Sequence, residues 1–343
     1  MKQRTKKIFN FLFIFGTLAV VLLVGINGQE MSGALDALRS IGPRWIVLCA
    51  LAYAGFLLFD TLSLHYFLIR QGQKVSFGYS LFVTLMGAYY SNITPGASGG
   101  QPMQVFYLSH KKVSIGVASS ALTVKLFCFQ FMLAVIGTVL WIAHGPFIHE
   151  QVGPHMWILI VGYVYNWFAV LLVVLMAFFR KPVQLLIRLC VRLGTLLRIC
   201  KDPDASLRKW GEVQESFHGS IFQLAKKPLD LATQLLLSGL QLLSLMTVIY
   251  FVYHAFGMSG EDYWQLTALG VMLYTSAAYT PLPGASGAQE GVFALYFAQV
   301  FPDGIRLMAL LLWRFFTYYV SLILGAVVSV ISGFRTGKPE TRS

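Results

Sequence analysis

Six apolar runs limit the folds that this chain can adopt more than any other feature of its sequence. They cover roughly residues 8–25, 45–69, 115–142, 156–179, 229–257 and 304–333. Each is close to the ~20 residues that a helix needs to cross the hydrocarbon core of a bilayer. A backbone inside lipid must satisfy its own hydrogen bonds, which leaves helices or closed barrels, and runs of this length favour helices. We therefore predict an all-α polytopic membrane protein, with residues 1–343 forming a single integral membrane domain.

Composition and charge agree with this prediction and give it an orientation. The chain is 57% hydrophobic and 12% charged, with a mean hydropathy of +0.67, which excludes an ordinary soluble domain. Most of its 26 Lys and Arg residues fall in segments 1–7, 70–74, 111–112, 180–227 and 335–342. The positive-inside rule then places both termini in the cytoplasm. These basic residues lie between spans, so we expect them to contact anionic lipid and expect no nucleic-acid binding.

Two further apolar segments, roughly 78–108 and 264–301, are each broken near the middle by the same motif. The first reads NITPGASGGQP and the second PLPGASGAQEG, with Pro95 and Pro283 separated by 188 residues. A full crossing by either segment would destroy the charge asymmetry. We therefore predict two re-entrant hairpins of paired half-helices, the first entering from the cytoplasm and the second from outside.

The same 188-residue offset relates the flanking spans. It maps 45–69 onto 233–257 and 115–142 onto 303–330, so that repeat 1 covers about 45–142 and repeat 2 about 233–330. Three full spans separate the hairpins, which turns the second unit upside down relative to the first. Interrupted helices at matching positions of an inverted-topology repeat are typical of a midplane substrate site in transporters.

Each motif predicts a helix start inside the membrane. Proline and glycine end the first half-helix, and the S-x-x-Q spacing of Ser98 with Gln101, and of Ser286 with Gln289, is that of a capping box. A helix N-terminus near the membrane centre presents backbone N–H groups and a partial positive charge to an anion. The same spacing is also expected if the boxes only terminate half-helices, with no ligand present.

Charged residues inside the spans complete the predicted site. Lys125 and Arg314 are the basic residues there, and an intramembrane charge is a functional hypothesis by default. Asp60 and Glu290 are predicted counter-charges or proton relays, and a purely structural role for both ion pairs stays open. The predicted lipid-phosphate-binding residues are Ser98, Gly99, Gly100, Gln101, Ser286, Gly287, Ala288, Gln289, Lys125 and Arg314. Tyr89, Tyr90, Asn92, Tyr274, Tyr279 and Thr280 precede the motifs and either line a cavity or serve in packing.

The remaining segments predict simpler roles. Segment 180–227 is expected to be a cytoplasmic amphipathic segment at the membrane surface, with partner binding as the alternative. Cys49, Cys128, Cys190 and Cys200 show no CxxC spacing and predict buried thiols. His144, His149 and His155 are predicted to flank a solvated loop beside Glu150, with a metal site as the weaker alternative. We predict no metal and no cofactor.

The paired motifs, together with VKLF around Lys125 and WRFF around Arg314, resemble the lysylphosphatidylglycerol synthase transmembrane region family. The resemblance covers roughly residues 8–335. Within that family, the chain resembles the small stand-alone members and the flippase half of the multiple peptide resistance factor. It implies a lipid flippase in the bacterial plasma membrane, handling lysyl-phosphatidylglycerol or another anionic phospholipid. In full-length relatives a soluble domain moves lysine onto phosphatidylglycerol, a reaction linked to antimicrobial-peptide resistance.

Three functions remain open from the sequence. The first is a flippase for a phosphate-bearing lipid. The second is a component of phosphatidylglycerol lysyltransferase that works with a separately encoded soluble transferase, since segment 180–227 is too small for that domain. The third is a non-transporting accessory to a lipid or envelope enzyme. The sequence does not name the lipid, the transport direction, the energy source or the oligomeric state.

Overall fold

A computed structural model describes residues 41–178 and 226–336, together with scattered positions between 185 and 211. The predicted span 8–25, two of the four cysteines and most of segment 180–227 lie outside the described residues. Those described are largely helical, and no β-strand occurs among them. The α-helical membrane fold predicted from the apolar runs is therefore confirmed.

The helices form two sets with the same order of elements. The first set consists of α3 (Pro43–Arg70), α4 (Phe77–Asn92), α5 (Gly100–His110) and α6 (Ile115–Val152). The second consists of α10 (Pro228–Ala255), α11 (Tyr263–Ala277), α12 (Ala288–Tyr296), α13 (Asp303–Arg314) and α14 (Val320–Thr336). Helix α7 (Met156–Phe178) follows the first set. Under the 188-residue offset the helix starts of the two sets agree to within a few residues, while their opposite orientation across a membrane stays a prediction.

Four stretches of the described residues are long and apolar enough to cross a membrane. They are Pro43–Arg70, Ile115–Leu175, Pro228–Ala255 and Asp303–Ile331, the second of which contains α6 and most of α7. Predicted spans 45–69, 229–257 and 304–333 each overlap one of these stretches, while 115–142 and 156–179 both fall on the second. In the last stretch, Asp303–Ile331, a π-helical turn at Phe315–Tyr319 joins α13 to α14. The predicted span 304–333 is therefore continuous, and its helix is wider at this turn.

The predicted loop after residue 142 is wrong. Helix α6 continues to Val152, so His144, His149 and Glu150 are helical rather than part of a solvated loop. Its backbone leaves helical geometry at His144, where φ is −122° and ψ is 25°, and Pro146 follows two residues later. Proline fits the first turn of a helical segment, where its missing N–H costs little, so the chain kinks here and resumes its helix.

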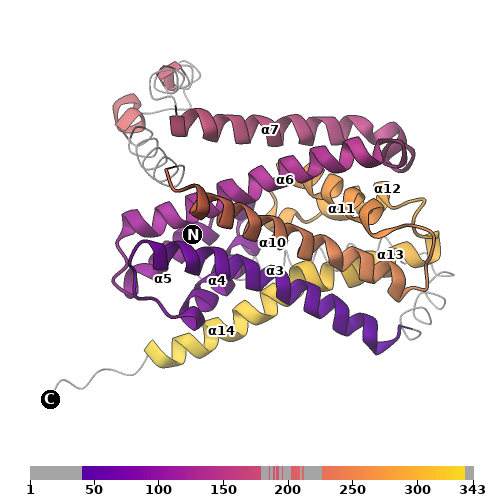
Figure 1. Cartoon of the computed structure of the whole chain (residues 1–343), viewed down its shortest axis with the longest axis horizontal. Helices are drawn as coiled ribbons and strands as arrows, with labels where there is room; N and C mark the ends of the chain where they lie inside the picture. The colour runs from indigo at the N-terminus through magenta and orange to yellow at the C-terminus, as the bar shows by residue number, and fades with distance from the viewer. Residues whose placement is uncertain are drawn as a thin grey trace.

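Helices α3 and α10 pack side by side through the middle of the molecule, while α6 and α7 lie together on one side and α14 on the other (Figure 1). Polar contacts follow the α3–α10 seam toward the end of α3. Ser63 Oγ donates to Gln234 Oε1 at 2.6 Å, and Tyr66 Oη donates to Asp230 Oδ1 at 2.7 Å. Arg70 Nε lies 2.9 Å from the same Asp230 oxygen. Hydrogen bonds and one ion pair thus fix the two sets to each other along this seam.

The buried apolar residues form two clusters, a larger one that draws on both sets and a smaller one in the first set. In the second set, the Phe293 ring stacks on Phe297 at 4.6 Å and on Trp313 at 5.4 Å between centroids. In the first set, Leu64 of α3 and Leu108 of α5 are fully buried in a smaller cluster. Burial of side chains of this size stabilises a fold by about 1.5–3 kcal/mol each in water. Inside a bilayer, the corresponding stabilisation comes mostly from close packing of the helices against each other.

The two motif turns have matching backbones and touch each other. Pro95–Ala97 and Pro283–Ala285 each form one short 3₁₀ turn, with φ of +57° at Gly96 and +60° at Gly284. The alanines that follow also have positive φ, +54° at Ala97 and +50° at Ala285. Positive φ is uncommon for a residue with a Cβ, so both turns hold local backbone strain.

Candidate functional site

A cavity of about 490 Å³ lies where the two turns meet. Both motifs contribute to its wall, the first through Gly96, Ala97 and Gln101 and the second through Gly284, Ala285 and Gln289. Helices α3, α4, α6, α10, α11 and α13 supply most of the rest of the lining. Backbone at a helix break must be covered by protein or face a water-filled space, and this cavity provides that space.

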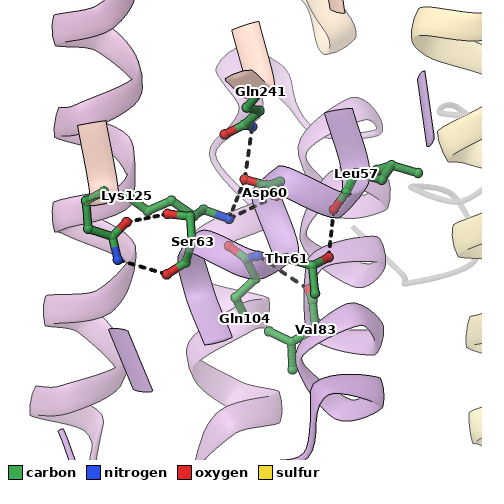
Figure 2. A network of polar contacts seen from close by, with 9 residues as sticks. Leu57, Asp60, Thr61, Ser63, Val83, Gln104, Lys125 and Gln241 are labelled. Atoms are coloured by element: carbon green, nitrogen blue, oxygen red, sulfur yellow. Dashed lines mark hydrogen bonds and ion pairs between the residues drawn. The ribbon is translucent and has the colours of Figure 1, made fainter. Parts of the chain in front are cut away.

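One charged cluster in the cavity joins three helices (Figure 2). Lys125 Nζ of α6 lies 3.0 Å from Oδ1 and 3.1 Å from Oδ2 of Asp60 on α3. Gln241 Nε2 of α10 donates to Asp60 Oδ1 at 3.0 Å. All three residues line the cavity, and the side chains of Lys125 and Asp60 are each 14% exposed. An ammonium carries three donors, so this carboxylate leaves at least one of them for a ligand.

Arg314 instead holds the second motif turn in place. Its guanidinium donates to Gln289 Oε1 at 2.6 Å, to Ser286 Oγ at 3.2 Å and to the Gly284 carbonyl at 3.3 Å. Its Nε lies 2.7 Å from Glu290 Oε1, and the Tyr318 ring lies 4.6 Å from its central carbon. These contacts support the structural role that the sequence left open, although Arg314 also lines the cavity.

The predicted capping boxes are wrong in both motifs. Helix α5 has Gly99 as its N-cap, and the Gly99 N–H donates to Thr94 Oγ1 at 2.9 Å rather than to a serine. Ser98 has helical dihedrals, φ −67° and ψ −18°, and so cannot serve as an extended N-cap. At α12 the Gly287 N–H donates to Glu290 Oε2 at 2.6 Å, while Ser286 is engaged by Arg314. At each helix start, a side chain of the protein therefore takes an N–H that we expected to face an anion.

The cavity gathers some of the predicted site residues and leaves out others. Asp60, Gln101, Lys125, Gln289 and Arg314 line it. Of the residues preceding the motifs, Asn92, Tyr274 and Thr280 also line it. The predicted residues that are not part of its lining are Ser98, Gly99, Gly100, Ser286, Gly287, Ala288, Glu290, Tyr89, Tyr90 and Tyr279.

Sequence reasoning missed three of the amide side chains of this cavity. Five glutamines line it, of which Gln104, Gln130 and Gln241 were not predicted. Gln241 is 5% exposed, and its Oε1 is a buried acceptor without a hydrogen-bond partner. A signal for Gln241 was available, because Gln234 and Gln241 stand two helical turns apart inside an apolar span. Polar residues in such a span generally face the protein interior.

Comparisons with known proteins match most of this chain. The model of the family described as lysylphosphatidylglycerol synthase TM region matches residues 8–325. A UPF0104 membrane protein from Archaeoglobus fulgidus is 23% identical over 270 residues, covering 75% of this chain and 76% of that protein.

Proposed function

This chain belongs to the family of the lysylphosphatidylglycerol synthase transmembrane region, and from that premise we propose that it is a flippase for a phosphate-bearing lipid. The observation that carries the proposal is the cavity, which brings together both motif turns, Lys125 and Arg314. Lysyl-phosphatidylglycerol and other anionic phospholipids are the candidate cargoes.

The lining of the cavity supports an anionic headgroup. The charged residues of the lining are Lys125, Arg314 and Asp60. Glu290 is not part of the lining, and its carboxylate contacts Gly287 and Arg314. Lys125 and Arg314 are each paired with one carboxylate, so a bound phosphate would rely on the donors that these ion pairs leave free. We propose that the phosphate accepts the remaining Lys125 N–H, because Arg314 is largely engaged by the second motif.

The edges of the cavity support access for the acyl chains. Leu126 on α6 and Leu282 beside the second turn both line it, and these residues are 46% and 41% exposed. A headgroup in the cavity would leave the apolar tails of its lipid in the bilayer beside such residues. In this proposal the two helix sets are inverted relative to each other, both termini are cytoplasmic and the membrane is the bacterial plasma membrane.

The test is lipid scrambling in proteoliposomes, with fluorescent phosphatidylglycerol and a neutral diacylglycerol analogue as cargoes. We expect phosphatidylglycerol to flip faster than in protein-free vesicles, and the Lys125→Gln variant to lose most of that excess. Lys74→Gln, which removes an exposed charge outside the cavity, is the matched control and should flip lipid at the wild-type rate. Equal rates for Lys125→Gln and wild type, from folded protein, would remove this site from the mechanism.

A separately encoded soluble transferase remains part of the proposal as a source of lysyl-phosphatidylglycerol. Flipping of that lipid without flipping of phosphatidylglycerol would identify the aminoacylated lipid as the cargo. Comparable rates for both would show that the aminoacyl group is not required.

A further inference from the structure

The two motif turns share one sequence and adopt two backbones. Both read PGASG, and their backbones match as far as the alanine. In the first turn, Ser98 has φ −67° and ψ −18° and Gly99 has φ −87° and ψ −20°, which is the geometry of a type I turn. In the second turn, Ser286 has φ −62° and ψ 142° and Gly287 has φ 87° and ψ −48°, which is close to a type II turn. The two forms differ by rotation of one peptide plane, so the same five residues support two states.

The state of the second turn goes with contacts from a basic side chain. The Arg314 guanidinium donates to Ser286 Oγ at 3.2 Å and to Gln289 Oε1 at 2.6 Å, and Ser286 is 2% exposed. The equivalent residues of the first turn, Ser98 and Gln101, are both exposed. The second turn is thus latched by an arginine, whereas the side chains that would form the same latch in the first turn face outward.

The first set contains the parts of the same latch but holds them apart. Lys125 lies within one residue of the position equivalent to Arg314, and it lines the cavity together with Gln101. Among the residues that the structure describes, its ammonium is bonded to Asp60 and forms no hydrogen bond with the first motif (Figure 2). A lysine carries its charge on a flexible four-carbon stem, so its ammonium can exchange one acceptor in the cavity for another.

The placement of the carboxylates explains why the two turns differ. Glu290 lies on α12, in the same hairpin as the second turn, so its pairing with Arg314 reinforces the latch. Asp60 lies on α3, outside the first hairpin, so its pairing with Lys125 competes with a latch. Val248 stands at the position equivalent to Asp60, so the second set has no competing carboxylate there.

We propose that Lys125 is a movable latch, which exchanges Asp60 for Gln101. The first turn then takes the backbone of the second turn, and Ser98 becomes buried. Gln101 belongs to the cavity wall, so this exchange reshapes the wall on the side of the first set. Its use in transport rests on the proposed function, whereas the exchange itself is a property of the fold and is measurable without lipid.

The experiment measures how fast a water-soluble maleimide labels Ser98→Cys in the full chain in detergent. Mass spectrometry of the peptide that carries residue 98 separates this thiol from the native cysteines. Asp60→Asn removes the competing carboxylate, and Lys125→Arg supplies a fork with five donors in place of three while keeping its charge opposite Asp60. Because labelling follows the unlatched fraction, a rise of the latched form to about 90% of molecules should slow labelling about tenfold in either variant.

Two controls assign the cause of any slowing. Gln101→Leu removes the proposed acceptor, and should restore the original labelling rate when it is added to either variant. Ser109→Cys, at the exposed end of α5, should be labelled equally fast in all of these proteins.

The outcomes separate the latch from the proposed transport. Unchanged labelling of residue 98 in folded Lys125→Arg or Asp60→Asn protein would overturn the inference, as would a slowing that Gln101→Leu does not reverse. Slowing that Gln101→Leu reverses would support the inference, even if the protein moves no lipid in proteoliposomes.

Discussion

Gly96 and Gly284 offer a matched pair of substitutions in the two motif turns. Their φ angles are +57° and +60°, so replacement by alanine imposes the same left-handed backbone at each. A Cβ at Gly96 would meet no atom within 4 Å, whereas a Cβ at Gly284 would overlap the ring of Tyr318. Tyr318 is 2% exposed and has little room to withdraw. The two variants thus share a backbone cost and differ in packing.

The magnitudes follow from these two costs. A left-handed conformation costs an alanine about 1–2 kcal/mol, partly offset by about 0.4–1 kcal/mol from the smaller entropy of the unfolded chain. We therefore expect Gly96→Ala to destabilise the protein by about 1 kcal/mol. Overpacking against Tyr318 adds about 1–3 kcal/mol, so Gly284→Ala should cost about 2–4 kcal/mol.

The assay is thermal unfolding of purified protein in one detergent, with each glycine variant made in wild type and in Tyr318→Leu. In the Tyr318→Leu background the ring is gone, and the cost of Gly284→Ala should fall to about that of Gly96→Ala, near 1 kcal/mol. Equal losses for the two glycine variants in wild type would refute the packing argument. So would an extra cost at Gly284 that persists without the Tyr318 ring.

Two other perturbations test the charges. Lys125→Met leaves the Asp60 carboxylate with Gln241 as its partner in the cluster, and should lower the free energy of unfolding by about 3 kcal/mol. The double variant Lys125→Met with Asp60→Asn should lose less stability than Lys125→Met alone. Additive losses of stability in thermal unfolding would contradict this coupling. Glu261 lies in the loop between α10 and α11, where desolvation, and then the charges of Asp262 and Glu150, raise the pKa of its carboxyl. The folded state therefore holds the proton of this carboxyl more tightly than the unfolded state does, so stability should fall as pH rises above the ordinary pKa of a glutamate, 4.5. Glu261→Gln should accordingly raise the melting temperature at about pH 8 but not at about pH 4. A stabilisation that is independent of pH would contradict the second expectation.

The order of the helices was predictable, because apolar runs and helix-capping residues determine helix formation over short stretches of sequence. The paired turns were predictable too, since proline and glycine at the same offset mark breaks that lipid would not otherwise tolerate. The capping boxes were predicted wrongly because the left-handed Ala97 and Ala285 lengthen each turn, which shifts the helix start from Ser to Gly. No short-range pattern in the sequence reports that shift.

Long-range pairings explain the other differences. Lys125 with Asp60 and Arg314 with Glu290 were predictable, because few charges are available inside the spans. Gln241 was not predicted, since its partner Asp60 lies 181 residues away on another helix and the repeat offset relates Gln241 to Tyr53 rather than to a polar residue. The π-helical turn at Phe315–Tyr319 also left no signal, since its aromatic residues fit an ordinary α-helix equally well.

The placement of the ion pairs bears on how the two helix sets could move. Lys125 and Asp60 both belong to the first set, and Arg314 and Glu290 both belong to the second. Near the turns the sets are joined by neutral hydrogen bonds, from Asn92 Nδ2 to Ser321 Oγ at 2.6 Å and from Tyr318 Oη to the Asn92 carbonyl at 3.3 Å.

Sliding one motif turn past the other would therefore exchange these neutral hydrogen bonds and the hydrogen bond from Gln241 to the Asp60 carboxylate, and would separate neither of these two ion pairs. The α3–α10 seam is different, because Arg70 and Asp230 are paired across it. The Arg70 side chain is 53% exposed, however, so solvent screens this pair and its separation costs little. The close packing of α3 against α10, more than charge, therefore opposes relative motion of the two sets.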